Sequence, residues 1–329
     1  MYAVSTLRLR RINPEKATDE LLDDPYGGIP GELLVTDERD GIYRYTMATR
    51  PGPLGIRIVG AVALLRVGQD PAAGIRLVDH ELTLANDEVE ANPREAWGAV
   101  WLMTPNAALD ELLAPQGEPM GNLSDSLGTV HRLEFYRNTA HNDLITKVIN
   151  SAPLLIADGH HRIRRLGLDG RRTPAIPVFI STLETALACV RPIHRIIHPP
   201  EAATTFTHFA SRHELRLRTT STEPVGPCLL WANKEFEVMP HFSSTRGFTE
   251  ESLADAELAS VNYDTADFAT SYPELRRRAS PTDLGVLCRP PSRDRLLSAL
   301  NGGRLLPPKT TLFSPKPLDA VVYEHAGTE

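Results

Sequence analysis

The chain has 329 residues, of which 41% are hydrophobic and 23% are charged, and this composition is typical of a globular protein of one or two domains. A chain of this length can bury a full core without disulfide or metal cross-links. Its formal net charge of -7 argues against a general nucleic-acid-binding protein, which is more often basic.

The cysteines and the apolar segments indicate where the protein works. Cys189, Cys228 and Cys288 are far apart and form no Cys-x-x-Cys pair, so we expect reduced, buried thiols rather than a disulfide framework or a structural zinc site. The first residues lack the apolar segment of a signal peptide, and no run of 18 apolar residues occurs. We therefore expect a cytoplasmic protein without a membrane partner.

The first half of the chain predicts mostly strands. Proline is frequent, at 27 residues, and divides the chain into short elements. Residues 92–105 are ambiguous between a helix and a mixed segment. The clearer elements are two strands around the turn Asp40-Gly41 in residues 33–49, strands at 56–67 and 129–137, and a helix at 141–150 that begins near Asn142 or Asp143.

The segment LLIADGHHRIRRLG, residues 154–167, places polar residues directly after an apolar run. It predicts a buried strand at Leu154–Ala157, a turn at Asp158-Gly159 and a short helix at His160–Leu168. The next strand is expected at 175–181. Such a strand–turn–helix–strand unit presents a helix N-terminus beside strand ends.

The second half begins near Pro199-Pro200, which precede a segment with helical character. Residues 227–239 alternate like strands, and the apolar residues of the tail at 305–325 indicate that it packs back onto the body. We expect an α+β protein with a core domain at 1–199 and an α+β domain at 200–329 whose tail returns to the core.

Residues 158–162 form a coherent site for phosphate. A helix N-terminus offers unpaired N–H groups, Gly159 permits close approach, and Arg162 can donate a forked pair of hydrogen bonds. His160 and His161 add donors, and Asp158 could hold Mg²⁺ or orient a histidine. The alternative is a helix capped by Asp158 with a cationic first turn. Each cation there costs roughly 0.3–1 kcal/mol.

A transition metal is not expected at these histidines. Adjacent residues on a helix point about 100° apart, so His160 and His161 are a poor chelating pair. The His-Glu-x-x-His pattern of zinc helices is also absent from this segment.

Three other segments carry polar groups with two interpretations each. His80 and Glu81, with Thr83, follow a strand-like run, where Glu81 could act as a general base or belong to a solvated acidic loop. Lys309, Thr310 and Thr311 of the tail could bind phosphate or lie in a surface loop. His194 and Arg195 lie in an apolar frame, where an anionic ligand or a salt bridge would satisfy them.

Four motifs in this order resemble a bacterial family, domain of unknown function 1015, which has a ParB/sulfiredoxin-like core. They are HELT at 80–83, IADGHHR at 156–162, RPIHRII at 191–197 and LLPPKTTLFSPK at 305–316. The resemblance covers roughly residues 30–325. The resemblance implies a nucleotide-binding core with a mixed sheet. Short relatives with the same Asp-Gly-His-His-Arg motif and an upstream His-Glu pair are free-serine kinases, which transfer a phosphoryl group from ADP or ATP to the serine hydroxyl.

The resemblance also implies roles for individual residues. The nucleotide would be ATP or ADP with Mg²⁺, and a homodimer is a possible assembly. The implied catalytic residues are His80, Glu81 and Asp158, the last also a candidate Mg²⁺ ligand; the phosphate-binding residues are Gly159, His160, His161, Arg162, Lys309 and Thr310; and the substrate-binding residues are Thr83, His194 and Arg195.

Two departures from the family bear on the acceptor. The usual Pro-Pro-Tyr-Asp-Val segment near the start is not recognisable, and IRRLGLDGRR at 163–172 replaces an aromatic residue followed by Glu-Thr-Ala. The acceptor could therefore be serine or another small hydroxy amino acid. The alternative function is a non-catalytic, ParB-like nucleotide-binding regulator.

Overall fold

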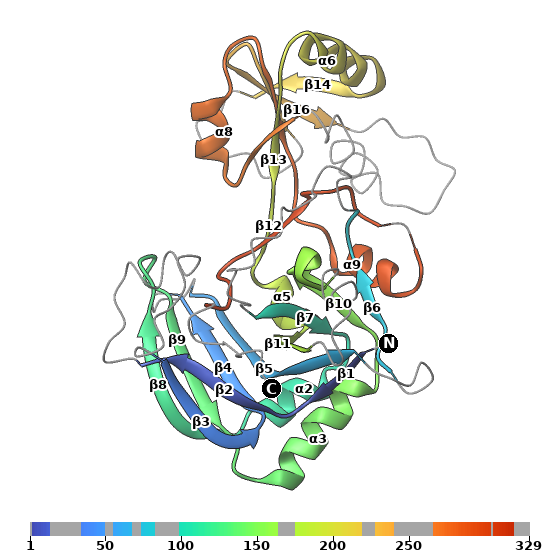
Figure 1. The fold of residues 1–329 in the computed structure, drawn as a ribbon. Coiled ribbons are helices and arrows are strands. Elements are labelled where there is room, and N and C mark those ends of the chain that lie inside the picture. The colour runs from blue at the N-terminus through green and yellow to red at the C-terminus, as the bar shows by residue number, and fades with distance from the viewer. Residues whose placement is uncertain are drawn as a thin grey trace.

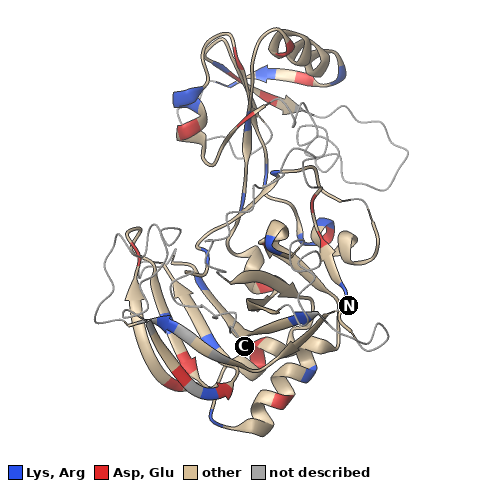
Figure 2. Ribbon diagram, viewed as in Figure 1, with Lys and Arg blue, Asp and Glu red and all other residues tan. Residues whose placement is uncertain are grey.

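The structure is a computed structural model that describes residues 2–13, 34–49, 55–67, 74–82, 99–163, 175–218, 228–239, 266–303 and 305–318. It has a mixed α+β fold with one large mixed sheet, as the sequence predicts. In Figure 1 this sheet forms the lower body, and a smaller antiparallel sheet forms the upper body. Figure 2 shows basic and acidic residues interspersed over both bodies.

The large sheet has nine strands in the described part of the chain. The path through it is β6-β10-β7-β11-β5-β4-β9-β8, and β1 pairs with β5 beside this path. The β6–β10 and β7–β11 pairs are parallel and the other pairs are antiparallel. The strands are β1 (Tyr2–Ser5), β4 (Tyr43–Ala48), β5 (Arg57–Val67), β6 (Leu77–Asp79), β7 (Val100–Thr104), β8 (Glu118–Ser124), β9 (Val130–Phe135), β10 (Leu154–Asp158) and β11 (Ala175–Thr182).

Most of the strand predictions in this half of the chain are confirmed. The segments at 33–49, 56–67, 129–137 and 175–181 contain β3 with β4, β5, β9 and β11 respectively. The expected turn at Asp40-Gly41 is wrong, because both residues belong to the end of β3 and pair with Arg8 and Leu7 of β2. The described part of the ambiguous segment at 92–105 is the strand β7, whose five residues are all buried. A strand buried on both faces reads as a continuous apolar run, which is why alternation did not reveal it.

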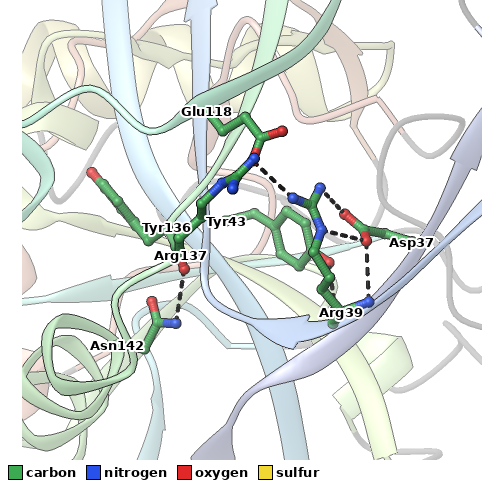
Figure 3. Close-up of polar contacts among 7 residues, drawn as sticks. All are labelled: Asp37, Arg39, Tyr43, Glu118, Tyr136, Arg137 and Asn142. Atoms are coloured by element: carbon green, nitrogen blue, oxygen red, sulfur yellow. Dashed lines mark hydrogen bonds and ion pairs between the residues drawn. The ribbon is translucent and has the colours of Figure 1, made fainter.

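Among the helices whose bounds lie within the described residues, those that contribute to the core of the large sheet are α2 (Ala108–Leu113), α3 (Thr139–Asn150), α5 (Leu183–Leu187) and α9 (Arg293–Leu300). The helix predicted at 141–150 is confirmed as α3, but it begins two residues earlier, at Thr139, so neither Asn142 nor Asp143 caps it. The helix is capped by Asn138, whose side chain accepts a hydrogen bond from the backbone N–H of His141. Asn142 is buried within the helix and donates to the carbonyl of Tyr136 at 3.0 Å (Figure 3).

A two-stranded ribbon of β2 (Leu7–Ile12) and β3 (Leu34–Gly41) is tied to the large sheet through Arg39. Figure 3 shows the Arg39 guanidinium between Asp37 and Glu118, with nitrogen–oxygen distances of 2.8 Å to each carboxylate. The guanidinium also lies 4.2 Å from the centre of the Phe135 ring. These contacts place the ribbon against β8 and β9.

The smaller sheet is antiparallel, in the order β14-β16-β15-β18-β13-β17, and α6 (Glu201–Arg212) and α8 (Tyr272–Arg278) accompany it. It has apolar clusters of its own, separate from the core of the large sheet. Its strands are β13 (His194–Ile197), β14 (Glu214–Leu217), β15 (Cys228–Trp231), β16 (Lys234–Met239), β17 (Asp267–Ala269) and β18 (Leu284–Leu287).

The tail returns to the large sheet, as the sequence predicts. Its strand β19 (Thr311–Phe313) pairs antiparallel with β12 (Val190–Pro192), and Leu306 and Phe313 are buried in the core of the large sheet. The chain leaves the large sheet after β11 and enters the smaller sheet at β13, with α5 and β12 between them. The division into domains at 199/200 stays a prediction, and this passage favours a boundary a few residues earlier.

Among the described residues, no helix combines the length and apolar character that crossing a membrane requires.

Gly60, on the central strand β5, gives a test of the packing of the large sheet. A Cβ atom there would meet the Phe179 ring and would lie 2.7 Å from the carbonyl oxygen of Ile180. We expect Gly60→Ala to lower the free energy of unfolding by about 1–3 kcal/mol, because β11 cannot move away without breaking its pairing. Urea denaturation measures this.

Gly302→Ala is the matched control for Gly60→Ala. No atom lies within 4 Å of its added Cβ, and only its φ of +76° opposes the substitution. Equal losses in the two variants would contradict the packing argument.

Candidate active site

The predicted turn after β10 is present, and a helical turn begins directly behind it. Gly159 has a φ of +94°, and the backbone N–H of Ile163 donates to its carbonyl at 3.1 Å. A Cβ at Gly159 would lie 2.9 Å from Val100 Cγ2 and 3.2 Å from Arg162 Nε. Both the backbone angle and the available space therefore require glycine here.

Asp158 is held by two cations. Its Oδ1 accepts from Lys316 Nζ at 2.6 Å, and its Oδ2 accepts from Arg162 Nη2 at 3.3 Å. Burial is the largest single influence on the pKa of Asp158 and raises it, but Lys316 and Arg162 together bring this pKa below its ordinary value. The carboxylate is therefore ionised at neutral pH and lies between a tail residue and the helical turn.

Arg162 also contacts the neighbouring strand. Its Nη1 donates to the carbonyl of Ala99 at 3.2 Å, and its side chain is 26% exposed. The guanidinium thus lies beside the turn at Gly159, where it is partly accessible to solvent. It could exchange its contact with Asp158 for a phosphate oxygen without leaving this position.

His160 is oriented by Asp79, at the end of β6. The distance from His160 Nδ1 to Asp79 Oδ1 is 2.7 Å, and because a carboxylate can only accept, Nδ1 carries the hydrogen. The Nε2 atom is buried and has no hydrogen-bond partner within the described residues. An unsatisfied buried nitrogen is a natural contact for a ligand atom. His161, the next residue, is half-buried.

His80 is fully buried beside this pair, with its ring centre 5.4 Å from that of His160. Its Nδ1 donates to the carbonyl of Ile156 at 2.7 Å, and its Nε2 lies 2.7 Å from Thr311 Oγ1. Burial lowers the pKa of His80 and outweighs the opposing effect of Glu81. The ring is therefore neutral, and its Nε2 accepts a hydrogen bond from the Thr311 hydroxyl.

Glu81 is positioned by the returning tail. Its Oε2 accepts from the backbone N–H of Thr310 at 3.1 Å and lies 3.2 Å from Thr311 Oγ1. The side chain is 15% exposed, and Oε1 makes no hydrogen bond within the described part of the chain. One carboxylate oxygen is thus fixed by the protein, while the other remains available to a ligand.

The backbone around Glu81 explains how the tail reaches it. Leu306 donates its N–H to the carbonyl of His80 at 2.8 Å and accepts from the N–H of Leu82 at 2.8 Å. Thr310 is buried, and its hydroxyl donates to the carbonyl of Pro307 at 2.6 Å. Thr310 therefore acts at this site through its backbone N–H. Lys309 is half-buried, with a φ of +54°.

The structure brings most of the predicted residues together in one cluster. His80, Glu81, Asp158, His160, Arg162 and Thr310 are linked by the contacts above, with Gly159 at the turn. Thr83 lies outside the described residues. Thr311, one of the tail residues considered for phosphate binding, also belongs to this cluster, as do Asp79 and Lys316, to which the sequence analysis assigned no role. The tail motif contains Thr311 and Lys316, and Asp79 directly precedes the His-Glu pair.

His194 and Arg195 lie in the smaller sheet, on β13. His194 Nδ1 accepts from the backbone N–H of Cys288 at 3.2 Å, and Arg195 is fully buried. Arg195 donates to Cys288 Sγ at 3.2 Å and to the carbonyl of Pro308 at 3.3 Å. The substrate-binding role expected for these two residues stays a prediction, and their burial gives it no support.

The residues around Asp158 do not fit a protein-held Mg²⁺. Both carboxylate oxygens already accept hydrogen bonds from cationic side chains, which would repel a metal ion. Within the described ranges, no three His, Cys, Asp or Glu side chains converge as ligands. Mg²⁺ commonly binds nucleotide phosphates and water rather than a complete protein cage.

Comparison with known proteins adds the family. The profile of a family described as "Protein of unknown function (DUF1015)" matches residues 29–249, more than half of the chain. The chain belongs to this family. The predicted family is thus confirmed over residues 29–249, which contain three of the four motifs, and the tail motif at 305–316 lies outside the match. No curated protein matches the chain.

Three solved structures share part of the chain path. SbnI from Staphylococcus aureus, with a C-terminal truncation, is 11% identical over 75% of this chain and 84% of its own, with a TM-score of 0.44. A free serine kinase variant in complex with ADP is 14% identical over 75% and 89%, with a TM-score of 0.38. A conserved hypothetical protein from Pyrococcus furiosus is 15% identical over 50% and 73%, with a TM-score of 0.32. Similarity at this level does not identify a substrate or ligand for this chain.

His194 predicts a pH dependence of stability. Burial, followed by the charge of Arg195, lowers the pKa of His194 from 6.5 to about 4. The unfolded chain therefore binds a proton at this residue more readily, and stability falls as the pH drops from 6.5 towards 4. The loss from this residue is at most about 3 kcal/mol.

His194→Asn isolates this contribution, because the asparagine oxygen can still accept from Cys288 N–H but does not titrate in this range. We expect its stability to fall less steeply than that of the wild type in urea denaturation at pH 6.5, 5.5 and 4.5. Parallel pH dependence in the two proteins would contradict the assignment.

Proposed function

We propose that this protein is a cytoplasmic, nucleotide-dependent phosphotransferase with a ParB/sulfiredoxin-like core. It would use ATP or ADP to phosphorylate the hydroxyl group of free serine or a similar small hydroxy amino acid. The observation that carries the proposal is the Glu81 carboxylate, with one oxygen held by the tail and the other available, in the same cluster as the turn at Gly159 and the Arg162 guanidinium.

The turn at Gly159 supports the phosphate end of the site. The first backbone N–H groups of the helical turn have no partners within the helix, and glycine lets a phosphate approach them closely. Arg162 and Lys316 add two positive charges, both now directed at Asp158. On nucleotide binding, phosphate oxygens would share these cations and neutralise them. Phosphoryl transfer depends mainly on such positioning and charge stabilisation.

Glu81 supports the acceptor end of the site. The hydroxyl oxygen of the acceptor would form a bond to the terminal phosphorus while the bond from phosphorus to the bridging oxygen breaks. The hydroxyl proton would pass to Glu81 Oε1, and the shortened nucleotide would leave with the electron pair of the broken bond. A general base must lie about 3 Å from the proton donor, so the hydroxyl oxygen of the acceptor would bind about 3 Å from Glu81 Oε1.

Replacement of Glu81 tests the assigned base. Glu81→Gln keeps the size and the hydrogen bond to Thr310 but cannot accept a proton, so we expect turnover to fall at least about 100-fold. Nucleotide affinity, measured by calorimetry, should change less than about threefold, because the amide does not remove a phosphate contact.

The control for this variant is Glu111→Gln, on the exposed side of α2. Both the control and the wild type should have the same turnover. Near-normal turnover in Glu81→Gln would refute the role of Glu81.

Arg162 provides a separate test of the phosphate end. Arg162→Met removes the forked donor, and we expect nucleotide affinity to fall about tenfold or more, as for the loss of a hydrogen bond to a charged group. Arg277→Met on the exposed face of α8 is the matched control and should leave affinity unchanged. Unchanged affinity in both variants would place the phosphates elsewhere.

The alternative, a ParB-like nucleotide-binding regulator, differs in its products. The protein is incubated with ATP or ADP, Mg²⁺ and a panel of hydroxy amino acids, and the products are followed by phosphorus NMR. A phosphomonoester signal that requires both nucleotide and acceptor supports the phosphotransferase. Nucleotide binding without such a product would instead support the regulator.

A further inference from the structure

Arg195 is a fully buried cation without an acidic partner. Its side chain has no exposed surface, and within the described part of the chain no carboxylate pairs with it. Nη1 contacts Cys288 Sγ, Nη2 contacts the carbonyl of Pro308, and Nε has no hydrogen bond. Burying a guanidinium is costly unless its hydrogen bonds compensate. Only two hydrogen bonds of the guanidinium within the described residues therefore offset the burial of Arg195, and one of them is the bond to the carbonyl of Pro308.

Pro308 belongs to the tight turn that leads into β19. The hydroxyl of Thr310 donates to the carbonyl of Pro307 at 2.6 Å, and Lys309 has a φ of +54°, in the left-handed region. A non-glycine residue in this region carries backbone strain, so the turn needs contacts from outside to hold its shape. The Arg195 guanidinium provides such a contact at 3.3 Å.

The same turn holds the candidate base. The backbone N–H of Thr310 donates to Glu81 Oε2 at 3.1 Å, and the carbonyl of Thr310 accepts from Ile193 N–H at 3.4 Å. The segment Ile193–Arg195 thus hydrogen-bonds to the turn at two points, through the backbone N–H of Ile193 and through the Arg195 guanidinium. Within the same turn, Thr310 contacts the Glu81 carboxylate that is proposed to accept the proton.

We propose that Arg195 is a positioning residue for Glu81. It fixes the carbonyl of Pro308, which sets the Thr310 N–H and thereby the orientation of the Glu81 carboxylate. It does not touch nucleotide or acceptor, because its side chain is enclosed by the protein. Through Arg195, the smaller sheet determines the geometry of a site built on the large one. The catalytic part of this inference rests on the proposed function.

Cys288 anchors the other side of the guanidinium. Its Sγ lies 3.2 Å from Arg195 Nη1, and its backbone N–H donates to His194 Nδ1 at 3.2 Å. Cys288, which directly follows β18, therefore contacts both side chains of the pair His194 and Arg195. The guanidinium lies between this anchor and the tail, which gives Arg195 little freedom to follow a displaced turn.

The experiment compares Arg195→Met, Arg195→Lys and Arg216→Met. Methionine removes the donors but fills similar space, and replacing a buried charge with an apolar side chain often leaves a protein stable. Lysine can still donate to the carbonyl of Pro308. Arg216, exposed on β14 and paired with Glu214, is the control. The measurements are amide hydrogen exchange at Thr310, and kcat and KM for the acceptor-dependent reaction.

In Arg195→Met we expect exchange at Thr310 to rise at least about tenfold, as for loss of one hydrogen bond from a charged donor. kcat should fall by a similar factor, while KM for the nucleotide stays within about twofold, because a positioning residue acts on the transition state. Arg195→Lys should recover part of both effects, and Arg216→Met should equal the wild type.

Unchanged exchange at Thr310 in Arg195→Met would overturn the proposal. A rise in KM for the acceptor alone, with normal exchange and kcat, would overturn it in favour of direct substrate binding. Hydrogen exchange does not require activity, so it tests whether Arg195 holds the Thr310 N–H in place even if the wild type transfers no phosphoryl group. If Arg195→Met does not fold, Arg195→Lys and Cys288→Ala provide the same comparison with smaller expected changes.

Discussion

Two backbone hydrogen bonds between Leu306 and the segment His80–Leu82 hold the candidate site together. They attach the tail beside β6, and the tail then supplies the Thr310 N–H, the Thr311 hydroxyl and the Lys316 ammonium. Without this attachment, Glu81 would have neither of its hydrogen-bonding partners in the protein, and Asp158 would lose its closest cation. The site is therefore a property of the joined segments rather than of any one motif.

The candidate site relies on contacts between residues far apart in the sequence, because each local segment forms hydrogen bonds to only part of its own polar groups. Glu81 and Thr310 are 229 positions apart, and Lys316 and Asp158 are 158 apart. Closing such loops costs conformational entropy that grows only slowly with length. Burial of Leu306 and Phe313 in the core of the large sheet offsets this cost. The apolar residues of the tail thus place its polar ones.

The sequence predicted the local features of this arrangement well. The turn at Asp158-Gly159 follows from an apolar run ending in a residue pair that permits positive φ, and both signals lie within a few residues. The return of the tail followed from its apolar residues. The start of α3 was misplaced because Asn138 and Asn142 are equally good capping residues by type, and only packing decides which one is buried.

Pairings between distant residues could not be predicted in the same way. Lys316 and Thr311 stood in a motif of recognised type, but no local pattern indicates that one reaches Asp158 and the other His80. Arg195 was expected to meet an anionic ligand or a carboxylate, since a buried cation ordinarily needs one. Its partners are a thiol and a carbonyl, which carry no signal in the sequence.

The order of synthesis gives the attachment at Leu306 a further consequence. The strand β10, its turn and the His80–Glu81 segment leave the ribosome well before the tail does, and a chain folding from its N-terminus would form the large sheet first. Until residues 305–318 emerge, such a chain would have the Gly159 turn and an exposed Glu81, with no amide to orient the carboxylate. Assembly of the site would therefore wait for the tail, so that a product truncated before residue 305 could retain much of the fold and still lack the arrangement proposed for phosphoryl transfer.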